Sequence, residues 1–338
     1  MPFIDKLFNY RSLSIVGLEK NSGKTECLNY ILNRIPSNKY KIAVSSIGID
    51  GESLDQVTKT HKPEIILKEG IYFTTSEKHY KQKRVSSEVL DISNHSTSLG
   101  RLITAKTLSK GKVLLSGPAS SAIFSKWITQ QHQRYNVDLC IVDGALSRLS
   151  IASPAVSESM ILTTGAAVSI NMNELINKTS FVVDLINLPV VEELNINKAI
   201  KLDSGIYFLE KDGSLTESNI NSAFSSDFLE KEYDSNFKAI YLTGALTDRF
   251  LNRYMLQDRY NQKAIIVKDF TKIFVNNNTY SRFVQKGGVI KVLRRSNLIA
   301  VCINPISPNG YKLNSETLCN RLSEKILLPV YNVVKDES

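Results

Sequence analysis

The stretch SIVGLEKNSGKT at residues 14–25 joins a short apolar run to a loop bounded by glycines and then to the start of a helix. Apolar side chains recur after it at helical spacing, at Cys27, Leu28, Ile31, Leu32 and Ile35. A strand that enters a helix through such a loop directs backbone N–H groups and the positive end of the helix dipole at one point. The stretch therefore predicts a phosphate-binding loop.

The spacing of this loop assigns roles to its residues. It reads Gly-x5-Gly-Lys-Thr, one residue longer than the usual Gly-x4-Gly-Lys-Ser/Thr pattern. We expect Lys24 to reach the β- and γ-phosphates and the Thr25 hydroxyl to ligate Mg²⁺. Chance, or a glycine-rich turn that packs a helix on a sheet, also explains the bare pattern, but the strand–loop–helix context favours nucleotide binding. The predicted nucleotide-binding residues are Gly17, Asn21, Ser22, Gly23, Lys24 and Thr25.

A metal-binding carboxylate is expected at the end of another apolar strand. Asp143 ends the run at residues 138–142 and precedes Gly144, the position of an aspartate that holds Mg²⁺ directly or through water. A strand-ending Asp-Gly turn is the alternative. Asp50 follows a second apolar strand and is explained equally well as a further Mg²⁺ ligand or as a turn residue. Lys24 and Asp143 are the predicted catalytic residues, and Thr25, Asp143 and Asp50 are the candidate metal ligands.

The rest of the first half alternates apolar runs with helical segments. Strands are expected at residues 13–16, 41–47, 113–116, 138–142 and 160–163, and each is followed by small or polar residues. Apolar strands that alternate with helices indicate a parallel sheet covered on both faces, with the ligand beyond the carboxyl ends of the strands. The predicted fold class is α/β, a P-loop NTPase with a mostly parallel sheet covered by helices, plus a second α/β region.

The length of 338 residues suggests one large domain or two smaller ones. We expect a P-loop nucleotide-binding domain at residues 1–195, with a polar, hairpin-containing insertion at about 68–110, and a C-terminal α/β domain at residues 196–338. The second domain is expected to contain a hairpin around residues 205–216 and strands at 239–242, 264–267, 298–303 and 326–331.

Composition narrows the class of protein. The formal charge of 42 − 33 = +9 permits an anionic partner, but spread over this length it does not indicate nucleic-acid binding. The basic cluster at residues 78–84 fits a solvated edge better than an RNA or acidic-protein contact. Four scattered cysteines fit free thiols. No apolar run approaches membrane-spanning or signal-peptide length, so a soluble, cytoplasmic protein is expected.

The nucleotide is expected to be ATP. A guanine-reading Asn-Lys-x-Asp motif is missing, because the nearest string, residues 177–180, reads NKTS and lacks the carboxylate.

The segment at residues 147–153 follows Asp143. Arg148 within it either reaches the phosphates or a partner carboxylate, or belongs to a polar helix start.

The long loop and the Asp143-Gly144-Ala145 turn resemble those of dethiobiotin synthetase and the cobyrinic acid amidases, a branch of P-loop NTPases. Two departures weaken a ligase interpretation. The lysine that the synthetase carries after its second strand has no counterpart at residues 45–48, and Glu19 replaces the signature lysine of the branch.

A second resemblance covers roughly residues 12–170. The strings VGLEKNSGKT (16–25), SSIGIDGE (45–52), IVDGALSRLSIASPAV (141–156) and ILTTGAAVS (161–169) are similar to the P-loop subunit of the lysine 5,6-aminomutase reactivase. This resemblance implies an ATP-dependent chaperone that releases damaged cobalamin from an adenosylcobalamin-dependent aminomutase. It also implies a partner subunit of the MutS-like ATPase type.

Three classes of function follow. The first is the reactivating chaperone, with ATP and Mg²⁺ as cofactors and lysine fermentation as its setting. The second is a dethiobiotin-synthetase-like ligase that acts on a small carboxylate. The third is a non-catalytic nucleotide-binding regulatory module, which would not need Lys24, Thr25 and Asp143 together. The sequence leaves open whether the protein forms a homo-oligomer, and no membrane partner is expected.

Overall fold

The computed structural model describes residues 3–47, 64–118, 120–145, 153–154, 156–192, 194–218, 237–257 and 262–334. The chain divides into two compact units. Unit 1 comprises Met1–Ser180 and Asn297–Ser338, and unit 2 comprises Phe181–Ser296. The predicted division at residues 195/196 differs from this one, because the last part of the chain returns to the first unit.

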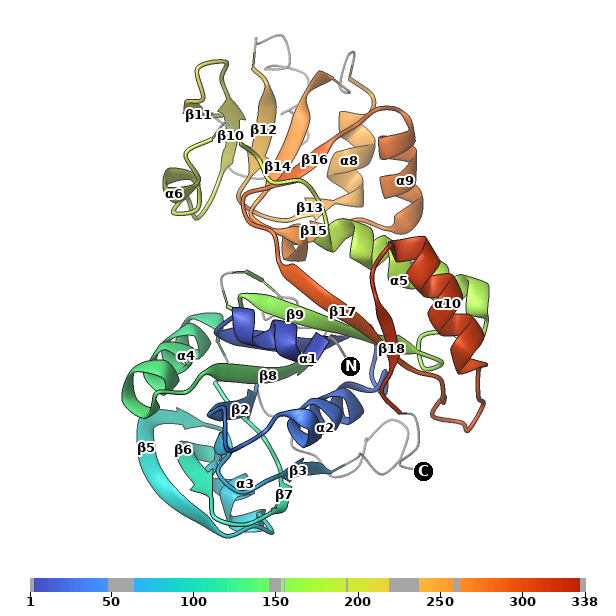
Figure 1. Ribbon diagram of the computed structural model, residues 1–338. Helices are drawn as coiled ribbons and strands as arrows, with labels where there is room; N and C mark the ends of the chain where they lie inside the picture. The colour runs from blue at the N-terminus through green and yellow to red at the C-terminus, as the bar shows by residue number, and fades with distance from the viewer. Residues whose placement is uncertain are drawn as a thin grey trace. The chain divides into compact units, whose positions relative to one another are not determined.

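Among the described residues of unit 1, nine strands form one sheet, in the order β18-β17-β9-β1-β8-β2-β4-β6-β5 (Figure 1). The strands from β18 to β4 run parallel, and β6 and β5 are antiparallel additions at one edge. Their bounds are β1 Ser12–Gly17, β2 Ile42–Ser46, β4 Tyr72–Ser76, β5 Ser87–Thr97, β6 Gly100–Thr107, β8 Leu139–Ala145, β9 Ser159–Gly165, β17 Asn297–Asn304 and β18 Val330–Asn332. The predicted mostly parallel sheet is confirmed.

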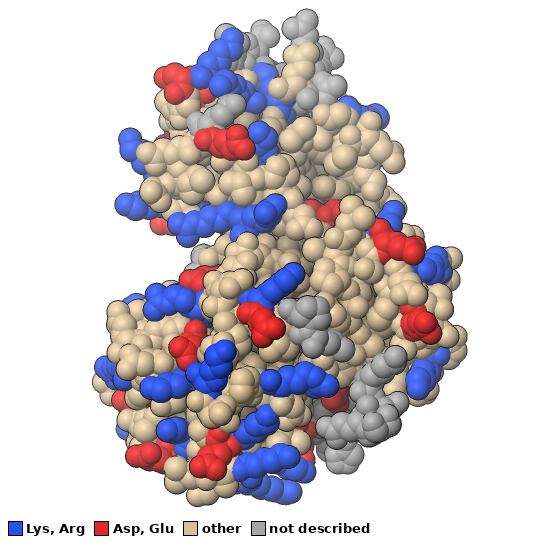
Figure 2. Space-filling view, in the orientation of Figure 1, with Lys and Arg blue, Asp and Glu red and all other residues tan. Residues whose placement is uncertain are grey.

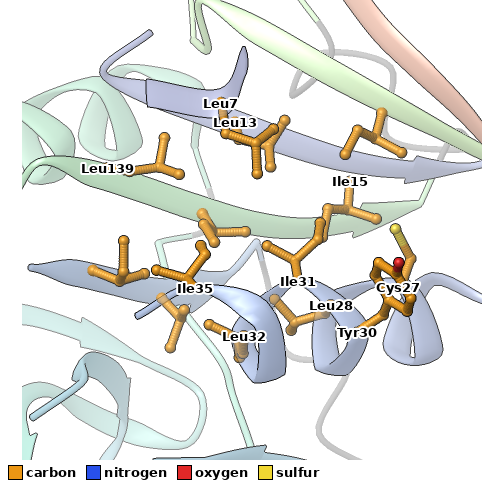
Figure 3. Packing of buried hydrophobic residues seen from close by; sticks show 14 of the residues in the cluster. Leu7, Leu13, Ile15, Cys27, Leu28, Tyr30, Ile31, Leu32, Ile35 and Leu139 are labelled. Atoms are coloured by element: carbon orange, nitrogen blue, oxygen red, sulfur yellow. The ribbon is translucent and has the colours of Figure 1, made fainter. Parts of the chain in front are cut away.

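Strand β1 lies inside this sheet, between β8 and β9. Its six residues are all buried, because helices cover both faces of the sheet. On one face, α1 (Phe3–Lys6), the 3-10 turn η1 (Leu7–Asn9) and α2 (Lys24–Arg34) pack on Leu13 and Ile15 of β1 and on Leu139 of β8 (Figure 3). The predicted apolar face of α2 supplies this contact through Cys27, Leu28, Ile31 and Leu32, followed by Ile35 just after the helix.

The opposite face of the sheet carries α4 (Ser121–Tyr135). Phe124 and Trp127 of this helix pack with Cys140 and Val142 of β8 in a second apolar cluster. Alternate residues of β8 therefore point into two different cores, as the pleat of a strand requires. Two more helices follow strands of this half of the sheet. Helix α5 (Met172–Ile186) comes after β9, and α10 (Ser315–Ile326) lies between β17 and β18 in the chain. The boundary between the two units falls within α5. Arg321 of α10 donates a hydrogen bond to Asn173 of α5 at 2.7 Å.

Two predicted elements of the first half differ from the structure. The run at 113–116 does not join the parallel sheet: β7 ends at Val113 (Gly111–Val113) and pairs antiparallel with β3 (Ile65–Leu67). The segment at about 68–110 does contain the predicted hairpin, β5–β6, but it is no interruption of the sheet. It also holds α3 (Glu77–Gln82) and the parallel strand β4, whose polar residues are buried.

In the described part of unit 2, five strands form a second sheet, in the order β11-β10-β12-β14-β16. The strands are β10 Ile206–Leu209, β11 Leu215–Glu217, β12 Ala239–Leu242, β14 Ala264–Val267 and β16 Ile290–Val292. The predicted hairpin is β10–β11, and β12, β14 and β16 run parallel. The remaining elements are α6 Ile196–Ala199, β13 Leu246–Thr247, α8 Asp248–Tyr254, η4 Phe270–Lys272, β15 Ile273–Phe274 and α9 Asn277–Gln285.

The strands predicted near residues 298–303 and 326–331 lie in unit 1, whereas the predicted division placed them in a C-terminal domain. They correspond to β17 and β18, with α10 extending to Ile326. Strand β17 pairs with β9 from Asn297↔Ser159 to Asn304↔Gly165, so it completes the first sheet and not the second. The predicted C-terminal domain therefore consists of unit 2 followed by a return to unit 1.

The surface charges, the cysteines and the helix lengths say little about function. Figure 2 shows Lys and Arg side chains interspersed with Asp and Glu over the visible face of unit 1. All four cysteines are free thiols. None of the described helices is long and apolar enough to cross a membrane.

Candidate phosphate site

The predicted loop connects the end of β1 at Gly17 to the start of α2 at Lys24, as expected. Two of its residues have left-handed backbone conformations, Asn21 with φ 60° and Gly23 with φ 95°. Gly23 is the N-cap of α2 and provides no side-chain cap. The positive end of the helix dipole lies at this N-terminus, where an anion is favoured.

Gly17 is a point of close approach. A Cβ atom added there would lie 2.2 Å from Ser22 Oγ and 2.9 Å from Lys24 Cγ. The loop therefore curls back so that the end of β1 touches both the serine before Gly23 and the stem of the loop lysine. Only glycine fits this position without moving the loop. Although the loop is one residue longer than the usual pattern, its ends meet.

Strand β9 anchors the loop from one side through Thr163. The N–H of Leu18 donates to the carbonyl oxygen of Thr163 at 2.9 Å, and the hydroxyls of Ser22 and Thr163 are 3.0 Å apart. Ser22 is fully buried, and Thr163 is 1% exposed, so this hydroxyl pair is shielded from water. Ser22 thus holds the loop to β9 through its side chain.

Asn304 supports the loop from β17, two strands away from β1. Its Nδ2 lies 3.4 Å from the carbonyl oxygen of Asn21, and its Cβ would be 2.9 Å from a Cβ added to Gly23. Sequence reasoning missed this residue. The available signal was the rule that identified Asp143, since Asn304 ends the buried apolar run of β17 as Asp143 ends that of β8.

Asp143 lies in β8, directly beside β1, where it is opposite Ile15 in the parallel register. Its carbonyl oxygen accepts hydrogen bonds from the N–H of Ile47 at 3.2 Å and from the hydroxyl of Ser46 at 3.3 Å. These contacts join the ends of β8 and β2. Asp143 thus lies near the carboxyl end of β8, at the same edge of the sheet as the loop at residues 17–24.

The charge of Asp143 reaches the first turn of α2. The hydrogen bond with Cys302 and burial raise the pKa of the Cys27 thiol, and the electrostatic effect of Asp143 adds to this rise. Cys27 is two residues beyond Thr25 on the helix. The carboxylate therefore lies within electrostatic range of the turn that carries Lys24 and Thr25.

The residues present fit Mg²⁺ in chemical type. Thr25 supplies a hydroxyl oxygen and Asp143 a carboxylate oxygen, the hard donors that Mg²⁺ prefers. Among the described residues, no group of three or more histidine, cysteine or acidic side chains is arranged to hold a metal ion. A cation here would take its remaining oxygens from phosphate and water, as Mg²⁺ commonly does in nucleotide sites.

Glu26 is an unexpected acidic residue in the first turn of α2. Burial raises the pKa of its carboxyl above the ordinary value.

A buried polar network lies at the carboxyl end of β4, two strands from Asp143 in the same sheet. Its centre is the Ser116 hydroxyl, which is 3.0 Å from His79 Nδ1, accepts the N–H of Ser76 at 2.9 Å and lies 3.2 Å from the Thr75 hydroxyl. His79 is only 4% exposed, although the basic cluster at 78–84 was predicted as a solvated edge. For His79 that prediction is wrong.

Several predicted candidates lie outside the described residues. These are Asp50 and the part of the 147–153 segment that includes Arg148. Ser153 is described and is buried, with its carbonyl oxygen accepting the N–H of Val156 at 2.9 Å.

Comparisons of the chain with protein-family models, with curated proteins and with solved structures found no match.

Proposed function

We propose that this protein binds Mg-ATP at residues 17–25 and hydrolyses it. The observation that carries the proposal is the closed loop at the end of β1. Gly17 touches Ser22 and the stem of Lys24, while Asn21 and Gly23 have left-handed conformations. Successive backbone N–H groups in such a turn form a concave anion site, which the N-terminus of α2 extends.

Each side chain of the site has a distinct role in this proposal. Lys24 balances the charge of the β- and γ-phosphates, and Thr25 and Asp143 hold the metal ion. Mg²⁺, when bound, would neutralise charge that develops on the phosphate oxygens during transfer to water. Positioning and charge stabilisation account for most of the catalysis of phosphoryl transfer, so this short set of residues suffices for slow hydrolysis.

For the biological role, we propose an ATP-dependent reactivating chaperone of an adenosylcobalamin-dependent aminomutase. The segments at residues 16–25, 45–52, 141–156 and 161–169 that resemble the reactivase subunit support it. So does the end of β2, where a ligase of the synthetase type would need a lysine. Ser45 and Ser46 stand there, and the Ser45 hydroxyl donates to the Thr74 carbonyl at 3.1 Å. In this role the protein acts with a MutS-like ATPase subunit.

The nucleotide proposal is tested with two lysines of the same loop. Lys24 begins α2, whereas Lys20 is an exposed residue in the middle of the loop. Lys24→Ala should abolish Mg-ATP binding measured by calorimetry, and Lys20→Ala, which removes the same charge, should retain it. Equal affinity in wild type and Lys24→Ala would overturn the assignment.

The chaperone role is tested by reactivation. Inactivated aminomutase is incubated with this protein, the second subunit, Mg-ATP and fresh adenosylcobalamin. Recovery of turnover should require ATP and Lys24, and should survive Lys20→Ala. If recovery is the same with Lys24→Ala, the chaperone role is wrong. Rapid ATP consumption that depends on an added small carboxylate would favour the ligase instead.

A further inference from the structure

Asn304 is the last residue of β17, and its side chain lies against the phosphate loop, 283 residues away in sequence from its partner Asn21. Nδ2 is 3.4 Å from the Asn21 carbonyl oxygen. Its Cβ lies where a side chain on Gly23 would have to be, at 2.9 Å. Asn304 therefore contacts both loop residues that have positive φ angles.

These two residues are the part of the loop that most needs support. A non-glycine residue with a left-handed backbone is less stable by roughly 1–2 kcal/mol than in its ordinary conformations, although asparagine tolerates the region better than most residues. A loop in this state relaxes unless its surroundings hold it. On one side, Ser22 is held by Thr163 of β9. On the side of β17, the contact comes from Asn304.

The orientation of Asn304 is itself determined by its neighbours. Its Oδ1 accepts the N–H of Ile306 at 3.0 Å, which leaves the amide N–H₂ group directed to Asn21. Its own carbonyl oxygen accepts the N–H of Ala166 at 2.9 Å, beyond the end of β9. The side chain thus presents a donor to the loop from a rigid strand end.

We propose that Asn304 is a positioning residue that holds residues 21–23 in the conformation that receives a phosphate. The proposal rests on the nucleotide site proposed above and names a residue that controls its shape. Asn304 acts on the loop backbone, and the loop acts on the phosphate.

The neighbouring strand offers a matched control. Asn332 ends β18 as Asn304 ends β17, and its Oδ1 accepts the N–H of Val334 at 3.0 Å, the same two-residue turn. None of the described hydrogen bonds of Asn332 goes to the phosphate loop. Asn332→Ala therefore removes the same local turn without the loop contact.

The first experiment compares affinity with stability. Calorimetry should show Mg-ATP binding about 2- to 10-fold weaker in Asn304→Ala, the range for one lost hydrogen bond, and unchanged in Asn332→Ala. Asn304→Asp keeps the acceptor for Ile306 but replaces the donor with a negative charge beside the phosphate site. Asn304→Asp should therefore melt at a higher temperature than Asn304→Ala yet bind Mg-ATP more weakly. A merely structural role predicts the same order for both measurements, and that outcome would overturn the proposal.

The second experiment needs no nucleotide. Limited trypsin digestion of the apo protein should cut after the exposed Lys20 faster in Asn304→Ala than in Asn332→Ala, because the loop is less firmly held. If wild type binds no Mg-ATP but this difference appears, the nucleotide function fails while the positioning role stands. If the two variants are cut at the same rate, the positioning role is wrong whatever ATP does.

Discussion

Replacing Gly17 by alanine tests the shape of the loop at residues 17–24, the proposed phosphate site, with a single methyl group. The new Cβ would be 2.2 Å from Ser22 Oγ, whereas ordinary van der Waals contact begins at 3.4 Å. The Ser22 hydroxyl must then move by about 3.4 − 2.2 = 1.2 Å, or the backbone must move instead. Because Ser22 is fully buried and 3.0 Å from the Thr163 hydroxyl, its movement also disturbs that hydrogen bond.

The expected magnitude follows from this overlap. Inserting one methyl group into a closely packed site costs about 1–3 kcal/mol. If the loop opens to relieve the overlap, Mg-ATP must close it again, and the same free energy weakens binding by about 5- to 150-fold. If the loop stays closed, the overlap instead lowers the free energy of unfolding. Since the loop is held at only a few points, we expect the larger part of the effect in binding.

The assay is calorimetric titration with Mg-ATP, together with thermal unfolding of the apo protein. Gly244→Ala is the matched control, since Gly244 also follows a parallel strand, β12, and an added Cβ there meets no atom within 4 Å. It should change neither measurement. Wild-type affinity and stability in Gly17→Ala would show that the loop does not have this closed shape, and the argument for a phosphate site would fail.

Three further predictions concern the metal ion, the nucleobase of the nucleotide and a buried histidine. Asp143→Asn should reduce ATP hydrolysis by about two orders of magnitude while ATP still binds, because the shape is kept but the metal-holding charge is lost; unchanged turnover would place the ligand elsewhere, with Asp50 the next candidate. Mg-ATP should bind better than Mg-GTP in competition titrations, and preference for GTP would reveal a guanine contact outside the 177–180 string. Burial and then the charge of Lys78 lower the pKa of His79 below 6.5 in the folded protein. As the pH falls through 6.5, the unfolded chain therefore binds more protons than the folded chain. The free energy of unfolding should decrease over this range until the pH has passed the lowered pKa. Chemical denaturation at several pH values should show that this part of the decrease is missing in His79→Asn; an identical pH dependence would contradict it.

The sequence predicted well the elements whose pattern is local. Strand β1, the loop and α2 follow one another in the chain, so apolar spacing and two glycines were enough to identify them. The same is true of β8, where an apolar run ends at Asp143. In each case the signal lies within about a dozen residues.

The sequence failed where burial depends on distant partners. Strand β4 was hidden in a polar segment because Thr74, Thr75 and Ser76 are buried hydroxyl residues with hydrogen-bond partners. Trp127 Nε1, for example, donates to Thr74 Oγ1 at 2.8 Å. No periodicity in residues 72–76 reveals a tryptophan supplied by α4.

The role of β17 was missed for a related reason. Its apolar run predicts a strand, but nothing within the run says that the strand lies beside β9 and not in the sheet of unit 2. The contact of Asn304 with the phosphate loop depends on that placement. Sequence position alone placed this residue in a C-terminal domain, whereas it lies in unit 1.

The return of the chain to unit 1 sets an order of events during synthesis. Ribosomes release the chain from its N-terminus, so β1, α2 and β9 emerge before the residues 181–296 that separate them from β17. Until residue 304 has emerged, one edge of β9 is uncovered and Asn21 has no support from β17. A ligand of the loop, as proposed, would therefore bind more tightly to chains translated at least this far and would stabilise those more. Unit 2 is one continuous stretch of chain, so it can form its own sheet before β17 has emerged.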